Sequence, residues 1–285
     1  ERVVAMVDEI VREYGGDPKP FPIDKIHVLK PDSVATITEG RLAGGIHRPL
    51  GLNIGVEKGE SKLMFASTIA HELFHLKSYK AARVGESGED VRLYRSGIAM
   101  VDRKDPNAEA GEEKEYFGML EEAIVAECVR KFLEQVSKEL PFREEAEAIA
   151  KIRNWAINYF RRAGTPEEKL KLLKNELKYI PNPQECVEQV ISFSKDEGER
   201  SAYTAGMLHR LVDEKQAESL ERYKERKMLY DLMDLLVEKS DGKFKNREEI
   251  FKEFARANFT GKYLSIAPTI EDILGKGSFR RLANE

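Results

Sequence analysis

The sequence predicts an α+β fold, because strand-like segments gather in the first half of the chain and helical segments in the second. Short stretches rich in β-branched residues, bounded by prolines and glycines, predict strands at 25–29 and 34–38 and a hairpin or bent pair of strands at 44–56. In the second half the apolar residues recur with helical spacing almost throughout. We therefore expect an α+β domain over residues 1–140 and an all-α domain over residues 141–285.

The predicted helices are separated by residues that interrupt the apolar spacing. The segment Gly15 to Pro18 ends the first helix, and Pro141 ends the helix that begins at Tyr116. Pro49 and the glycines around it favour an edge position for the strands at 44–56. Helices are expected over residues 1–14, 63–82, 116–140, 143–162, 166–179, 183–194, 199–239 and 247–258.

Composition and charge exclude several classes of protein. The 285 residues are 41% hydrophobic and 34% charged, and the net charge of −4 comes without a basic block, which argues against nucleic-acid binding. The longest apolar runs are too short to span a bilayer. Cys128 and Cys186 have neither the number nor the spacing of a disulfide framework or a sulfur metal site. We therefore expect a soluble, cytoplasmic protein that binds no nucleic acid and has no membrane-spanning segment in this sequence.

The segment His71-Glu72-Leu73-Phe74-His75 has the pattern H-E-x-x-H and lies in an apolar run that predicts a helix. Residues four apart lie on one face of a helix about one turn apart, so both imidazoles can reach one small cation. Glu72 follows the first histidine and can act on a water beside that cation. Two histidines, a third protein ligand and one open position form a catalytic zinc site. The segment therefore predicts that His71 and His75 bind Zn²⁺ and that Glu72 is the general base.

A third zinc ligand is expected on the next helix, because residues 120–129 are apolar almost all round and predict a buried element. A carboxylate inside such a helix is costly unless it is paired or bound to a metal. Glu121 and Glu122 both share a face with apolar residues, so helical phase leaves either one as the ligand. Glu127 lies nearer to charged residues and is expected to be more exposed.

His71, Glu72 and His75, followed by Glu122-Ala123-Ile124 on a second helix, resemble the pattern of the gluzincin (thermolysin-like) zinc peptidases. The resemblance covers roughly residues 40–135, and the short first domain is similar to the compact members called minigluzincins. The resemblance implies that Glu122 is the third zinc ligand. It also implies a small, twisted, mainly antiparallel sheet packed on the motif helix and the ligand helix.

The sequence departs from the gluzincin pattern beside the third ligand. Glu121 stands where the family often has asparagine, and Ala126 stands where it has an acid that orients a zinc-bound histidine. Glu127, displaced by one residue, is a candidate for that orienting role, with plain surface charge as the alternative. The family uses a tyrosine or histidine to stabilise the oxyanion, which here implies Tyr94, Tyr116 or His209.

The resemblance implies a zinc-dependent endo- or oligopeptidase. In the expected mechanism zinc lowers the pKa of its water toward ~7, and Glu72 takes the proton as the water attacks the peptide bond. The substrate is expected to bind as an extended strand along the segment 52–56, where a glycine allows close backbone approach; an ordinary edge strand is the alternative.

A second hypothesis is a regulatory or binding protein that keeps the zinc site while its helical half binds a partner. Glu72 favours the peptidase over this alternative. A structural zinc site is usually closed by four protein ligands and needs no base.

Overall fold

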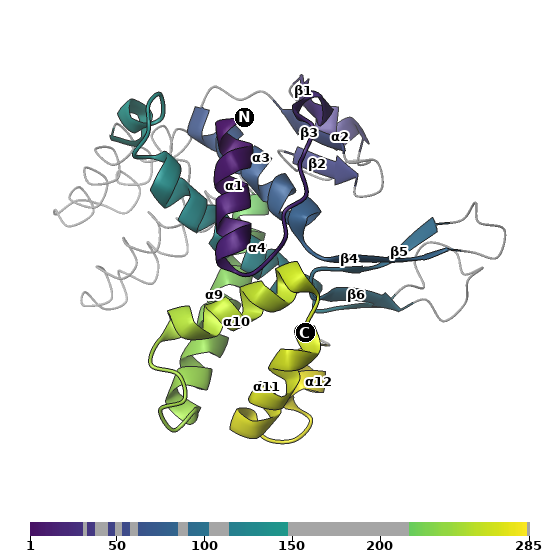
Figure 1. Cartoon of the computed structure of the whole chain (residues 1–285), viewed down its shortest axis with the longest axis vertical. Helices are drawn as coiled ribbons and strands as arrows, with labels where there is room; N and C mark the ends of the chain where they lie inside the picture. The colour runs from purple at the N-terminus through teal and green to yellow at the C-terminus, as the bar shows by residue number, and fades with distance from the viewer. Residues whose placement is uncertain are drawn as a thin grey trace, which may run out of the picture.

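The computed structural model of the chain describes residues 1–30, 33–37, 45–48, 53–57, 62–84, 91–102, 114–147 and 217–283. Over these residues the fold is α+β, as the sequence predicts, with two small sheets set among helices (Figure 1). The predicted helices at 166–179 and 183–194, and most of the one at 143–162, lie outside the described residues.

Helices and strands alternate in the amino-terminal half. In chain order they are α1 (Arg2–Glu13), η1 (Ile23–Lys25), β1 (Ile26–Leu29), α2 (Ser33–Ile37), β2 (Gly45–Arg48), β3 (Asn53–Glu57), α3 (Lys62–Lys77), β4 (Lys80–Val84), β5 (Val91–Ser96), β6 (Ala99–Asp102), β7 (Lys114–Tyr116) and α4 (Gly118–Val136). The helix predicted over residues 1–14 is α1, and the strand predicted at 25–29 is β1.

The described part of the carboxy-terminal half is helical, as predicted. It comprises α9 (Ala217–Lys239), α10 (Arg247–Thr260), η3 (Tyr263–Ser265), α11 (Ile266–Leu274) and α12 (Ser278–Leu282). Asn246 caps the start of α10, because its side chain accepts a hydrogen bond from the amide of Glu249. Gly261 ends the same helix with φ of 75°, a backbone conformation that favours glycine.

The first sheet has the strand order β1-β3-β2, with β1 parallel and β2 antiparallel to β3. The second sheet is antiparallel, in the order β4-β5-β6-β7. This topology corrects the expectation that the segment 52–56 offers an edge to a substrate. Residues Asn53–Glu57 form the central strand, whose backbone groups already face a strand on each side. The described edge strand that contacts α3 is β2.

Two other predictions of secondary structure were wrong, one in the type of an element and one in its end. The strand expected at 34–38 is the helix α2, whose Val34 is buried and donates its amide to Glu57 Oε1 at 2.7 Å. The motif helix, expected to reach residue 82, ends at Lys77. The Tyr79 amide donates to the carbonyl of Asn258 at 3.0 Å, and the residues from Lys80 onward pair with β5. In both places long-range contacts outweigh local propensity.

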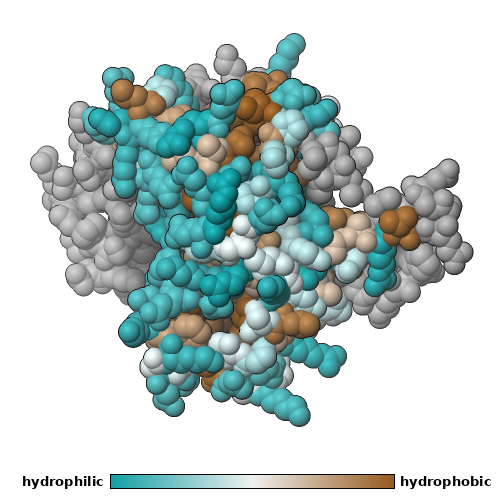
Figure 2. All heavy atoms as spheres, viewed as in Figure 1, coloured by the Kyte–Doolittle hydropathy of each residue, from teal (hydrophilic) through white to brown (hydrophobic). Residues whose placement is uncertain are grey.

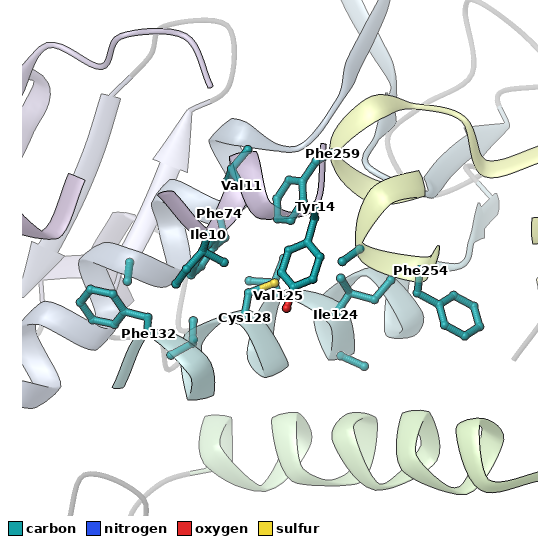
Figure 3. Packing of buried hydrophobic residues seen from close by; sticks show 14 of the residues in the cluster. Ile10, Val11, Tyr14, Phe74, Ile124, Val125, Cys128, Phe132, Phe254 and Phe259 are labelled. Atoms are coloured by element: carbon teal, nitrogen blue, oxygen red, sulfur yellow. The ribbon is translucent and has the colours of Figure 1, made fainter. Parts of the chain in front are cut away.

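One apolar core joins the described parts of the two halves of the chain. The central helix α4 contacts α1, α3, α9 and α10. Figure 3 shows Phe74 of α3, Phe132 of α4 and Phe254 of α10 within this core, and all three are at most 1% exposed. Burying one such side chain stabilises the fold by about 1.5–3 kcal/mol. The described carboxy-terminal helices therefore support the helices that carry the candidate ligands, while the predicted domain division at residue 140 stays a prediction.

Hydrophilic side chains cover much of the molecular face in Figure 2, with smaller apolar areas between them. This surface agrees with the 34% of charged residues in the sequence. Among the described helices, none combines the length and the apolar character needed to cross a membrane.

Candidate metal centre

The helix α3 carries the three motif residues into the interior. His71, Glu72 and His75 are 3%, 5% and 4% exposed, which is exceptional for groups that carry or can carry a charge. The two imidazoles lie one turn apart, and their Nε2 atoms are 2.9 Å from each other. The motif therefore directs two buried ring nitrogens at one point.

The helix α4 crosses α3 and brings Glu122 to the same point. Its Oε1 lies 3.2 Å from His75 Nε2, and its Oε2 lies 3.7 Å from His71 Nε2. One ligand atom from each of His71, His75 and Glu122 lies within 4.8 Å of the others. The structure thus brings together the three residues that the sequence predicts as metal ligands.

Glu121 approaches the opposite side of the His75 ring. Its Oε1 lies 3.1 Å from His75 Nδ1, and its side chain is as buried as that of the histidine. Burial lowers the pKa of His75, but the charges of Glu121 and then Glu122 outweigh burial and raise this pKa well above its usual value. When the ring is neutral, as metal binding requires, an Nδ1–H that donates to Glu121 leaves the Nε2 lone pair facing Glu122 and His71.

Both interpretations of Glu127 were wrong. It does not orient a motif histidine, and it is not a surface charge. Glu127 is 5% exposed and accepts hydrogen bonds from Arg130 and from the hydroxyl of Tyr230 on α9. One residue along a helix turns the side chain by about 100°. This turn points Glu127 away from α3. Its ion pair with Arg130 lies within α4, and the hydrogen bond from Tyr230 links α4 to α9.

His47 on β2 is a residue of the site that the sequence did not indicate. Its Nδ1 lies 2.6 Å from Glu72 Oε2, and its ring stacks on that of His75 with centroids 5.0 Å apart and an interplanar angle of 16°. His47 has no particular spacing from the motif, so only its place on a strand before the motif helix could have drawn notice.

Of the three residues considered for oxyanion stabilisation, the structure describes Tyr94 and Tyr116. Tyr94 on β5 lies under Arg83, with 5.0 Å between the guanidinium carbon and the ring centroid. Tyr116 on β7 pairs with Met100 of β6. His209 lies outside the described residues.

The charges around the site favour a cation. Burial, followed by the charges of Glu121 and Glu122, raises the pKa of the nearby Glu115 carboxyl. Burial lowers the pKa of Lys80 to about 8, and the charge of Glu121 opposes this only in part. The Lys80 amine donates to Ser96 Oγ rather than to a carboxylate. The carboxylates of Glu121 and Glu122 thus both face His75, and a bound cation would relieve their mutual repulsion.

The three candidate ligands fit a zinc ion. Two imidazole nitrogens and one carboxylate oxygen are a donor set that catalytic zinc sites use. Tetrahedral ligands about 2.1 Å from zinc are roughly 3.4 Å from one another. The distances of 2.9, 3.2 and 3.7 Å between the donor atoms lie around this value.

No family model, curated protein or solved structure matches the chain. The likeness to gluzincins is therefore a prediction from the motif residues, and the site is interpreted from its own geometry.

Proposed function

We propose that the protein is a zinc-dependent peptidase of the gluzincin type. The observation that carries the proposal is the convergence of His71 Nε2, His75 Nε2 and the Glu122 carboxylate. The carboxylate of Glu72 reaches His47, whose ring stacks on that of His75. These residues would hold the ion, and a bound zinc would supply Lewis acidity that polarises a carbonyl and makes water more acidic.

Glu72 is proposed as the group that moves protons. Its carboxylate is buried next to the ligands, so it can take a proton from the attacking water and pass it to the leaving amine.

The edge strand β2 is proposed as the place where the substrate backbone binds. A described edge strand has backbone groups free to pair with an extended peptide, and β2 runs directly over α3. A Cβ placed on Gly45 of this strand would lie 2.9 Å from Glu72 Oε1, which shows how closely the strand approaches the proposed base. A peptide paired with β2 would therefore lie beside Glu72.

Replacing the base tests the proposal. The Glu72→Gln variant should bind about one zinc per chain, like the parent, while losing cleavage of a mixed peptide library by at least about 100-fold. Chelation should abolish cleavage by the parent, and added zinc should restore it. Cleavage by Glu72→Gln at the parent rate would refute the mechanism. A parent that binds one zinc and cleaves no peptide would instead support a regulatory protein that keeps the zinc site.

A further inference from the structure

One face of β2 is built to meet the motif helix. Gly45 and His47 are two residues apart, so both lie on the same side of the strand. Their partners in β3 are Val56 and Ile54, both 0% exposed, so this side of the sheet faces the core. A Cβ at Gly45 would lie 2.7 Å from Thr68 Cγ2 on α3. The pairing of β2 with β3 therefore places His47 against the second half of α3.

The His47 side chain makes two contacts there. Its Nδ1–H donates to Glu72 Oε2 across 2.6 Å, and its ring stacks on His75. The Glu72 side chain is 6% exposed, so its carboxylate has little water to bond with and needs a protein donor. A hydrogen bond to an ionised carboxylate is roughly twice as strong as a neutral one. His47 therefore supplies the hydrogen-bond donor that the buried Glu72 carboxylate requires.

We propose that His47 is a positioning residue that fixes the carboxylate of Glu72 for proton transfer. The role rests on the proposed peptidase function. With Oε2 held by His47, the other oxygen, Oε1, is left to accept a proton from water. Because His47 lies on the proposed substrate strand, one element both aligns the peptide and fixes the base that acts on it.

Two other roles for His47 are distinguishable from this one. A fourth metal ligand would need a ring nitrogen aimed at the other ligands, whereas His47 Nδ1 faces Glu72 and the group of described ligands comprises His71, His75 and Glu122. A purely packing role would need only the ring, so a residue of similar bulk would replace it. The measurements below separate these roles.

Kinetics of two substitutions at residue 47 form the first test. His47→Leu keeps bulk and removes the donor, while His47→Asn keeps a short N–H donor. We expect His47→Leu to lower kcat about 10–100-fold with little change in KM, and His47→Asn to recover part of the loss. Zinc content should equal that of the parent in both. An unchanged kcat in His47→Leu, or loss of zinc from either variant, would overturn the proposal.

The matched control is His27→Leu. His27 lies on β1 of the same sheet, and its Nε2 lies 3.1 Å from Asn53 Oδ1, so this substitution also removes a histidine side-chain hydrogen bond. We expect kcat of His27→Leu to match the parent. An equal loss in His27→Leu and His47→Leu would mean that the sheet, rather than Glu72, transmits the effect, and the proposal would fail.

A spectroscopic test does not depend on activity. In protein labelled with ¹⁵N-histidine, Glu72→Gln should shift the His47 Nδ1 resonance, because the acceptor loses its charge. The signal is assigned by its loss in His47→Asn. If this resonance is the same with glutamate and glutamine at residue 72, His47 does not bond to Glu72. A parent without peptidase activity would refute the proposed function, whereas this measurement would still decide the contact.

Discussion

Glu121 Oε1 lies 3.1 Å from His75 Nδ1, while Oε1 of the adjacent Glu122 lies 3.2 Å from Nε2 of the same ring. Two consecutive glutamates on α4 thus approach one imidazole from two sides. The Glu121 side chain is buried and that of Glu122 is 38% exposed, so the two carboxylates have different environments. This geometry supports our proposal that Glu122 binds the metal and that Glu121 orients the His75 ring.

Zinc affinity should separate the two glutamates. Glu122→Ala removes a ligand atom and should lose most of the bound zinc, whereas Glu121→Gln should weaken binding by about 10–100-fold and still reach one zinc per chain at saturation. Glu134→Ala, which changes an exposed glutamate of the same helix, is the control and should bind zinc like the parent. Competition with a chromophoric chelator measures all three. A greater loss in Glu121→Gln than in Glu122→Ala would reverse the assignment.

The sequence predicted the parts of the site that depend on local geometry. His71 and His75 were found because helical spacing alone places them one turn apart. Helical phase could not separate Glu121 from Glu122. Both side chains leave α4 on the side that faces His75, and each reaches a different nitrogen of that ring. The choice depends on how α4 crosses α3, which no local pattern encodes.

Long-range partners explain the remaining differences. Glu127 is buried because Tyr230, 103 residues further along the chain, donates to it. The contact of His47 with Glu72 depends on the register of β2 against β3. The α+β class was predictable from periodicity, whereas α3 ends early because its next residues meet Asn258 and β5.

Asn258 fastens α10 to the end of the motif helix. It is 0% exposed, its Oδ1 accepts from the Ile98 amide at 3.0 Å, and its Nδ2 donates to Ser78 Oγ at 2.9 Å. Asn258→Ala leaves a buried amide without its acceptor and opens a cavity, so it should lower the free energy of unfolding by about 3 kcal/mol. Urea unfolding measures this. Asn246→Ala, which removes the exposed cap of α10, should cost only about 1 kcal/mol, and equal losses would contradict the prediction.

Lys80 should make stability rise with pH in alkaline solution. Burial lowers its pKa from 10.5 to about 8 in the folded protein. Between these values the unfolded chain binds more protons than the folded one, so the free energy of unfolding increases from about pH 8 to about pH 10.5. The full increase is on the order of 3 kcal/mol. Below pH 8 the buried charge destabilises the fold.

The Lys80→Met variant isolates this effect, because methionine does not titrate. Metal-free parent and variant are unfolded in urea at a series of pH values. The stability of the variant relative to the parent should be greatest near neutral pH and should decline as pH rises through the window. A difference between the two proteins that is constant with pH would show that Lys80 does not titrate abnormally.

Substitution of Gly45 tests whether catalysis requires the close approach of β2 to Glu72, the proposed base. A Cβ there would lie 2.7 Å from Thr68 Cγ2 and 2.9 Å from Glu72 Oε1, and Thr68 is a stiff β-branched residue on α3. Gly45→Ala should therefore move the strand or Glu72, which costs stability by about 1–3 kcal/mol and lowers kcat on the order of 100-fold.

Gly55→Ala is the matched control for this prediction. Gly55 lies on β3, and a Cβ there would meet the tip of the Leu29 side chain at 2.8 Å, on the side of the sheet away from Glu72. Because a leucine tip can rotate away, we expect a smaller loss of stability and a kcat close to that of the parent. Zinc content should be the same in both variants, since neither glycine touches a ligand. If Gly45→Ala retained the kcat of Gly55→Ala, close contact between β2 and Glu72 would not be required for catalysis.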